Sequence, residues 1–293
     1  MEYVKESKFE ITVPKVDNYF YHNEKDNKVY DYIHKGIQQG QNNNIMLVGP
    51  HGCGKSESCK QFAAKRKLKF FETNCSLYRE PREFFGIKGA YSGNTYFQKA
   101  QLIKAFETEN CVILLDEINR CASSVANSLY SLLDDRRDVY FDEIGYVKVA
   151  KGVTIFASKN TGLRYTGTSP SDISLMDRFK ITLEVDFLPE LEEIKVLVSR
   201  TNINQDDAYS LVKFANAVRS KAAEYGSSLR NTISTRILIG CAEMYNSLGT
   251  HAIDCTIIPL FSKEGGNDSE RSQVFLIKQM IFDSTLLQRE EIQ

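Results

Sequence analysis

A glycine-rich stretch, Gly49 to Ser58, follows directly on the apolar run Ile45 to Val48 and constrains this chain more than any other feature. An apolar run, a glycine-rich turn, a lysine and a hydroxyl residue in this order are typical of a loop that joins a strand to a helix around a phosphate. Glycines let backbone N–H groups turn toward phosphate oxygens, and the helix N-terminus adds partial positive charge. The predicted cofactor-binding residues are Gly49, Pro50, His51, Gly52, Cys53, Gly54, Lys55, Ser56 and Glu57.

The spacing Gly49-x-x-x-x-Gly54-Lys55-Ser56 satisfies the Walker A pattern. We expect Lys55 to reach the β and γ phosphates of a nucleoside triphosphate and the Ser56 hydroxyl to ligate Mg²⁺. His51 and Cys53 occupy loop positions where small or polar residues are usual, but the backbone rather than these side chains should do the binding. The predicted cofactors are ATP and Mg²⁺, although the pattern by itself does not separate adenine from guanine.

A second motif, "CVILLDEINR", places two acids at the end of an apolar strand, Val112 to Leu115. Ligands of open α/β sheets gather at the carboxyl ends of the strands. We therefore expect Asp116 to hold Mg²⁺ and Glu117 to polarise the attacking water. Two adjacent carboxylates favour hydrolysis of a nucleotide over phosphoryl transfer to a bound acceptor.

A third polar residue, Asn160, follows the apolar strand in "VTIFASKNTG". An amide at this place can hydrogen-bond the water or the γ phosphate and so report the nucleotide state. A residue of a simple turn would give the same local pattern, so both interpretations stay open from these residues alone.

Strands and helices alternate along the first part of the chain, which predicts an α/β fold with a mostly parallel sheet covered by helices on both faces. The predicted strands are Ile45 to Val48, Lys69 to Phe71, Val112 to Leu115 and Val153 to Ala157. Helical spacing predicts helices from Lys28 to Gln39 and from Ala122 to Arg136. A hairpin is predicted around Asp142 to Gly145.

From Pro189 onward the apolar residues keep helical spacing, with no comparable strand run. We therefore predict a leader over residues 1–27, an α/β nucleotide-binding domain over 28–188 and a smaller all-α lid domain over 189–293. Within the α/β domain, insertions are predicted near 84–98 and 139–149.

Composition excludes several other classes of protein. The 37 basic residues nearly cancel the 38 acidic ones among 293, so no global field draws the chain to nucleic acid or to a membrane. The seven cysteines form no C-x-x-C pair and are expected to be reduced thiols. No window approaches the ~20 apolar residues of a membrane span. These observations predict a soluble, cytoplasmic protein.

The order of motifs resembles the AAA+ ATPases of the MoxR type, in particular the branch with the cobaltochelatase ATPase subunit and the activators of rubisco and nitric oxide reductase. The Walker A motif, "LLDEINR", "ASKNTG", "YTGTSPSDISLMDRF" and "ISTRILIGCAEMYNSLG" carry this resemblance, which runs from about Pro14 to Leu248. "LLDEINR" followed by "NSLYSLLDDRR" is the more selective part. The segment after Asp254 has no clear counterpart in the family.

The resemblance implies roles for three further residues. Asn160 matches the sensor 1 residue, Arg178 in "MDRF" matches the arginine offered to a neighbouring subunit's γ phosphate, and Arg236 in "STR" matches sensor 2 on the lid. Such an arginine can be worth ~10³ to 10⁵ in rate. The rival candidates for the arginine that acts in trans are Arg120, Arg136 and Arg137. Aromatic residues of the two insertions are expected to pack their own hairpins or to grip a polypeptide, namely Tyr91, Tyr96 and Tyr140.

The resemblance also implies a ring, usually a hexamer, with nucleotide between subunits. The function hypothesis is Mg²⁺-dependent ATP hydrolysis that remodels or activates a partner protein. The resemblance also implies a separate partner that carries a von Willebrand factor A domain. Two alternatives remain at this point. One is a nucleic-acid motor or loader, which the balanced charge does not favour, and the other is a nucleotide-gated scaffold with little turnover.

Overall fold

In a computed structural model of the chain, the described residues are 10–91, 94–142, 145–160 and 174–290. They divide into two compact units. The first unit comprises Met1–Gly49 and Lys55–Val185, and the second comprises Pro50–Gly54 and Asp186–Gln293. The predicted motif "YTGTSPSDIS" lies almost wholly outside the described residues.

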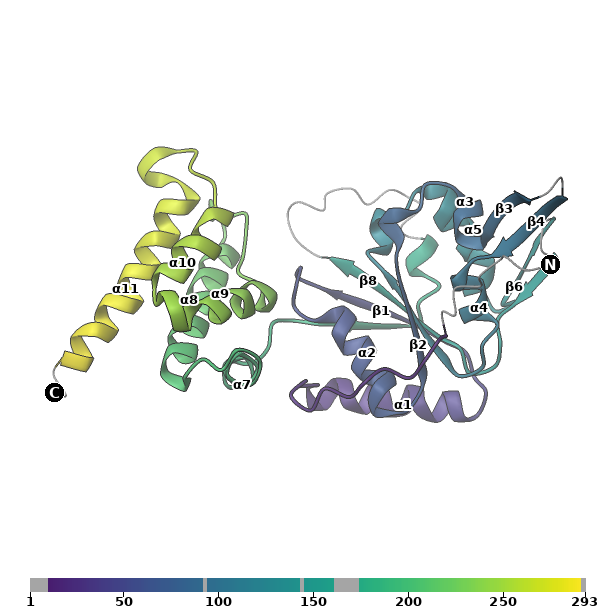
Figure 1. Cartoon of the computed structure of the whole chain (residues 1–293), viewed down its shortest axis with the longest axis horizontal. Helices are drawn as coiled ribbons and strands as arrows, with labels where there is room; N and C mark the ends of the chain where they lie inside the picture. Colours follow the sequence, from purple (N-terminus) through teal and green to yellow (C-terminus); the bar gives the residue numbers. More distant parts are fainter. Residues whose placement is uncertain (1–9, 92–93, 143–144, 161–173, 291–293) are drawn as a thin grey trace. The chain divides into compact units, whose positions relative to one another are not determined.

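A parallel sheet of five strands, in the order β2-β5-β8-β1-β9, forms the centre of the first unit (Figure 1). Its strands in chain order are β1 (Asn43–Gly49), β2 (Lys69–Asn74), β5 (Cys111–Asp116), β8 (Thr154–Asn160) and β9 (Ile181–Glu184). The first three contain the predicted strands, and β8 overlaps the predicted strand Val153 to Ala157 but begins one residue later. The short edge strand β9, which pairs with β1 only over Ile45 to Val48, was not predicted from the sequence.

Helices cover both faces of this sheet, as Figure 1 shows. Along β5 the side chains of Val112 and Leu114 join an apolar cluster with helices on one face, whereas Ile113 and Leu115 join a second cluster on the other. This double burial explains the continuous apolar run of the strand. The predicted α/β fold class is therefore confirmed.

The helices of the first unit are α1 (Glu24–Gln38), α2 (Lys55–Lys65), α3 (Pro81–Phe85), α4 (Gln101–Phe106) and α5 (Ser123–Leu133). Helix α1 begins at Glu24 rather than at the predicted Lys28, because the Asn23 side chain caps it by accepting the backbone N–H of Asp26. Helix α5 ends at Leu133 rather than at the predicted Arg136, because Asp134 adopts an extended conformation.

Two antiparallel hairpins also belong to the first unit: β3 (Gly86–Tyr91) with β4 (Asn94–Lys99), and β6 (Asp138–Phe141) with β7 (Gly145–Lys148). On the second hairpin, Tyr140 faces Tyr146 across the strands, and their ring centroids lie 5.1 Å apart. Both side chains remain mostly exposed while packing on each other. The side chains of Tyr91 and Tyr96 lie outside the described part of the chain.

The second unit contains helices, and no strand is described among its residues. The helices are α7 (Glu190–Thr201), α8 (Gln205–Ala223), α9 (Thr235–Leu248), α10 (His251–Thr256) and α11 (Glu270–Glu290). Glu193 on α7 is fully buried and accepts hydrogen bonds from both terminal nitrogens of Arg219 on α8, at 2.7 and 2.9 Å. The Thr235 hydroxyl on α9 donates to the same carboxylate at 2.6 Å, so one ion pair joins three helices.

Among the helices that the structure describes, none combines the length and the apolar character needed to cross a bilayer. All seven cysteines lie in the described ranges and are free thiols.

Candidate nucleotide site

The glycine-rich loop connects β1 to α2 with a backbone that only some residues can adopt. Gly52 and Gly54 have φ angles of 71° and 97°, in the region that favours glycine. Lys55 is the first residue of α2 and is only 6% exposed. Its Nζ donates to the carbonyl oxygen of Gly49 at 3.0 Å, which holds the ammonium group at the mouth of the loop. Backbone N–H groups and a cation are thus gathered at one helix N-terminus.

Ser56 and Asp116 meet beside this helix start. The Ser56 hydroxyl donates to Asp116 Oδ2 at 3.1 Å, across 60 positions of sequence. Asp116 ends β5, and Ser56 lies in the first turn of α2. A hydroxyl and a carboxylate oxygen are the hard ligands that Mg²⁺ prefers in phosphate-binding sites. The donor set is therefore suited to this metal ion.

Ser158 on β8 connects the two acidic residues. Its hydroxyl donates to Asp116 Oδ1 and accepts the backbone N–H of Glu117 at 2.9 Å. Ser158 lies two positions before Asn160, so both residues point to the same face of β8. This hydroxyl was not identified from the sequence, although the two-residue spacing from Asn160 was a usable signal.

Glu117 adopts a left-handed backbone conformation, with φ 53° and ψ 43°. Left-handed conformations are uncommon for residues other than glycine and gather at functional sites. Two side-chain amides converge on its carboxylate: Asn160 Nδ2 lies 3.3 Å from Oε1, and Asn74 Nδ2 lies 3.5 Å from Oε2. Arg120 Nη1 lies 3.3 Å from the same Oε2. The carboxylate is therefore held in place by groups from β8, β2 and its own turn.

Asn74 is the second site residue that the sequence reasoning missed. It pairs with Asp116 in the register of β2 and β5, so it stands at the carboxyl edge of the sheet beside the acids. Recognising it required knowledge that β2 neighbours β5.

Arg178 lies away from these residues, near the amino-terminal ends of the strands rather than the carboxyl ends. Its carbonyl oxygen accepts a hydrogen bond from Nδ2 of Asn44, near the start of β1, at 2.8 Å. Gly49, at the other end of β1, pairs with Asn160. Five residues of strand separate Asn44 from Gly49, which corresponds to about 16 Å. Arg178 is therefore not brought together with Lys55, Asp116 and Glu117 of the same chain.

Arg236 is the second residue of α9 in the helical unit, where its side chain is exposed. The preceding Ser234 caps this helix by accepting the backbone N–H of Ile237 at 3.3 Å.

The rival arginines have distinct surroundings. Arg120 contacts Glu117 within the site described above. Arg137 is bound inside the unit, where Nη1 donates to Asn44 Oδ1 at 2.8 Å, and burial lowers its pKa. Arg136 is 73% exposed, and its Nη2 lies 3.6 Å from Asp134 Oδ2. Of the three rivals, only Arg136 has a mostly exposed side chain whose described ion pair is with a residue other than Glu117.

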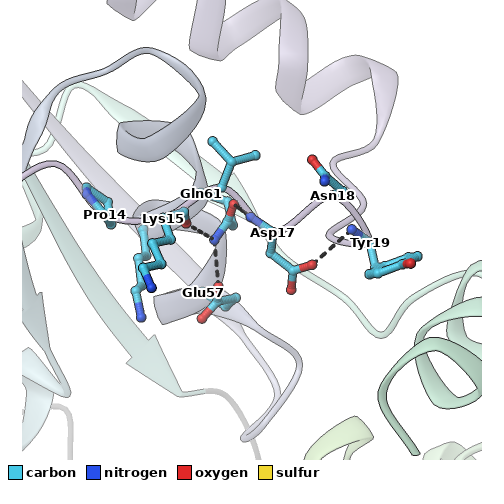
Figure 2. Close-up of a pocket in the computed structure, with 9 residues that line it drawn as sticks. Pro14, Lys15, Asp17, Asn18, Tyr19, Glu57 and Gln61 are labelled. Carbon is cyan, nitrogen blue, oxygen red and sulfur yellow. Dashed lines mark hydrogen bonds between the residues drawn. The ribbon is translucent and has the colours of Figure 1, made fainter. Parts of the chain in front are cut away.

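Residues 14–19 of the leader lie beside α2 and form a cleft of about 520 Å³ with it (Figure 2). Gln61 holds the leader in place: its Oε1 accepts from the backbone N–H of Asp17 at 2.7 Å, and its Nε2 donates to the carbonyl of Lys15 at 3.3 Å. The cleft is lined by residues 14–19 together with Glu57, Lys60 and Gln61. This cleft therefore borders the same helix that begins at Lys55.

The sheet order and the site together define a P-loop protein of the AAA+ class, whose domains are in general nucleotide-binding ATPases. Comparisons with known proteins narrow the class. The family described as "AAA domain (dynein-related subfamily)" matches residues 44–179, and the family "CbbQ/NirQ/NorQ C-terminal" matches residues 193–264.

Curated relatives agree with these matches. The protein named "Putative chaperone BssE" from Thauera aromatica is 35% identical over 241 residues, which cover 82% of each chain. "Protein NorQ" from Paracoccus denitrificans is 26% identical over 201 residues, covering 68% of this chain and 72% of the relative. The chain belongs to the MoxR-type AAA+ ATPases, and the resemblance stated from its motifs is confirmed.

Solved structures share the fold at low identity. The Thermotoga maritima RuvB Holliday junction branch migration motor aligns with a TM-score of 0.54 and 15% identity, covering 93% of this chain and 73% of that one. A point mutant of the same RuvB protein gives a TM-score of 0.55 at 18% identity, covering 86% of this chain and 75% of that one. At such identities the likeness concerns the AAA+ fold alone.

Proposed function

We propose that the chain hydrolyses ATP with the help of Mg²⁺ and uses the hydrolysis to remodel or activate a partner protein. The observation that carries this proposal is the convergence of four side chains at one edge of the sheet. Lys55 stands at the mouth of the loop, Ser56 lies 3.1 Å from Asp116, and Glu117 is adjacent to Asp116. One cation, a hydroxyl and two carboxylates are the groups that triphosphate hydrolysis requires.

Each residue has a separate task in this proposal. Lys55 and the loop N–H groups bind the β and γ phosphates. Ser56 and Asp116 would hold Mg²⁺, which when bound neutralises charge on the phosphates. Glu117 orients the attacking water and accepts its proton. Asn160, which donates to Glu117 at 3.3 Å, couples the position of this carboxylate to the γ phosphate.

The position of Arg178 supports assembly into a ring, for which we propose a hexamer. An arginine side chain extends much less than the roughly 16 Å of strand that separates its backbone from the loop of the same chain. Arg178 therefore serves a nucleotide only if that nucleotide is bound to another protomer. Arg236 is proposed as the sensor residue that the helical unit contributes.

Relatives support a protein client rather than a small acceptor. One is named as a putative chaperone and another as "Denitrification regulatory protein NirQ" from Stutzerimonas stutzeri, which is 26% identical over 206 residues. We propose by analogy that this chain also acts on a separate protein, and that a von Willebrand factor A domain partner assists it.

The test of hydrolysis is the substitution Glu117→Gln, which keeps the shape of the side chain and removes its basicity. Phosphate release should fall by ~10² to 10⁴-fold, while ATP affinity, measured by calorimetry, stays close to that of the unchanged chain. Glu107→Gln is the matched control, because Glu107 forms a surface pair with Lys99 at 2.8 Å. Full turnover in Glu117→Gln would remove Glu117 from its proposed role.

The same variant tests the client. Held in ATP, Glu117→Gln should retain a client that the nucleotide-free protein releases, and mass spectrometry of the captured protein identifies it. A wild-type chain that binds ATP but releases no phosphate would instead indicate a nucleotide-gated scaffold.

A further inference from the structure

Asp134, the residue that follows α5, lies between two arginines. Its Oδ1 lies 2.7 Å from Nε of Arg178, and its Oδ2 lies 3.6 Å from Nη2 of Arg136. The carboxylate and the Arg178 side chain are 27% and 25% exposed, so the pair is neither buried in the core nor freely solvated. At such a boundary an ion pair restrains a side chain more than a fully exposed pair does.

Two further contacts limit how Arg178 can move. The centre of its guanidinium group lies 4.2 Å from the centroid of the Tyr130 ring, in a cation–π arrangement. Its Nη1 donates to the carbonyl oxygen of Ser174. An ion pair, an aromatic ring and a carbonyl oxygen therefore all contact one guanidinium group.

The backbone beneath this group is also fixed. Asn44 Nδ2 donates to the carbonyl oxygens of both Arg178 and Leu133, each at 2.8 Å. Because Leu133 ends α5 and Asp134 follows it, a single buried amide sets the spacing between the carboxylate and the arginine.

We propose that Asp134 is the positioning residue of Arg178. It holds the guanidinium group oriented toward the nucleotide that is bound to a second copy of this chain. This inference rests on the proposed function, since it assumes hydrolysis in a ring. A free arginine side chain samples many rotamers, whereas a restrained one meets the developing charge of the transition state without ordering itself first. Arg136, whose Nη2 lies 3.6 Å from the other oxygen of Asp134, is a second and more exposed cation beside the same carboxylate.

The main test compares Asp134→Asn and Asp134→Ala with the wild-type chain. Phosphate release per chain should fall by about 10- to 100-fold, because a small displacement of a catalytic group costs that much. The KM for ATP should change little, because an arginine that acts on the charge developing in the transition state raises kcat without tightening ground-state binding. Asp134→Glu should recover part of the rate.

The matched control is Asp135→Ala, which also removes one carboxylate, from the next residue in the sequence. Asp135 is 95% exposed and lies 3.4 Å from Lys180 in a surface pair, so its loss should leave the rate unchanged. Arg178→Ala sets the rate expected when the arginine is absent. Asp134→Asn guards against misfolding, because asparagine preserves the shape of the side chain, and thermal unfolding is measured for each variant.

A mixing experiment tests action on a second copy. Asp134→Ala retains Lys55 and both acids, and Lys55→Ala retains the Asp134 and Arg178 pair. Each variant alone should be slow, and mixed rings should release phosphate several-fold faster than the sum of the two. Asp134 variants as fast as Asp135→Ala, with Arg178→Ala inactive, would overturn the positioning role and leave the proposed function standing. A wild-type chain without phosphate release would overturn both.

Discussion

At the scale of single residues, the site depends on a backbone conformation that the amino acid itself does not favour. A left-handed Glu117 costs of order 1–3 kcal/mol in backbone strain. The backbone N–H of Glu117 offsets this cost by donating to Ser158 Oγ at 2.9 Å and to Asp116 Oδ1 at 3.2 Å. In this conformation the Glu117 carboxylate reaches both Asn160 on β8 and Arg120 of the following 3₁₀ turn, each at 3.3 Å. Ser158 is therefore as much part of the site as the acids that it contacts.

His22 makes the free energy of unfolding depend on pH. Burial, with the nearby charges of Lys65 and Arg66, lowers the pKa of His22 from 6.5 to about 4, although its hydrogen bond with the Ser58 carbonyl opposes the shift. Between pH 6.5 and 4 the unfolded chain binds a proton at this position that the folded chain does not bind. The free energy of unfolding should therefore decrease as the pH falls through this window, by up to about 3 kcal/mol.

Urea unfolding at several pH values measures this effect. In His22→Gln the free energy of unfolding should decrease less between pH 6.5 and 4 than in the wild-type chain, by up to about 3 kcal/mol. The reason is that glutamine can donate to the Ser58 carbonyl and does not titrate. His251→Gln is the control, since the His251 side chain is 69% exposed. Identical pH profiles for His22→Gln and the wild-type chain would contradict the assignment.

At the scale of elements, the leader and α2 form one substructure. Gln61 is only 1% exposed, and its amide group contacts both the leader and Glu57 Oε1, the latter at 2.9 Å. Figure 2 shows these bonds on the side of α2 that borders the cleft. The helix that begins at Lys55 thus also holds the segment around Lys15 and Asp17 of the leader.

The helical unit depends on the buried pair of Glu193 and Arg219. Glu193→Ala should destabilise this unit by about 3–5 kcal/mol, because it leaves the Arg219 guanidinium buried without its carboxylate. Thr235 loses its acceptor as well. Hydrogen exchange at the backbone amides of α8 measures the stability of the helical unit alone. A single thermal unfolding midpoint would combine the stabilities of both units.

Glu192→Ala is the control on the same helix. Glu192 pairs with Lys195 at 2.8 Å, and the lysine is 67% exposed, so its loss should cost less than about 1 kcal/mol. Equal exchange rates in α8 for Glu192→Ala and Glu193→Ala would refute the importance of the buried pair.

At the scale of the whole molecule, the role proposed for Arg178 implies that one chain carries an incomplete site. The loop, the acids and Asn160 lie at the carboxyl edge of the sheet, and Arg178 lies at the amino edge. A protomer whose two interacting surfaces lie at different ends of the sheet associates with its neighbours head to tail. Such an assembly forms a closed ring when the rotation that relates neighbouring protomers adds up to a full turn.

Ring formation is therefore expected to follow nucleotide binding. Glu117→Gln with ATP and Mg²⁺ should sediment at several times the 33.4 kDa of one chain, and removal of nucleotide should shift it toward smaller species. Analytical ultracentrifugation over a range of protein concentrations measures this. A mass of one chain at every concentration with ATP bound would exclude the ring.

Much of this protein was readable from local sequence. The apolar runs predicted four strands of the central sheet, the motif order predicted the family, and both the fold class and the family are confirmed. Lys55, Asp116, Glu117 and Asn160 could be nominated because the carboxyl ends of parallel strands share one edge of a sheet, whatever their order. The Walker A spacing indicated Lys55 and the position after an apolar strand indicated the two acids, whereas the same position left Asn160 open between a sensor and a turn residue.

Only the tertiary structure decided the rest. Asn74 and Ser158 approach the acids because β2 and β8 are the neighbours of β5, and strand order is set by packing over the whole sheet rather than by local pattern. The short strand β9 forms because β1 offers it an edge to pair with. The pairing of Arg178 with Asp134 joins residues 44 positions apart, through a contact that exists only once α5 and the segment before β9 converge at the start of β1.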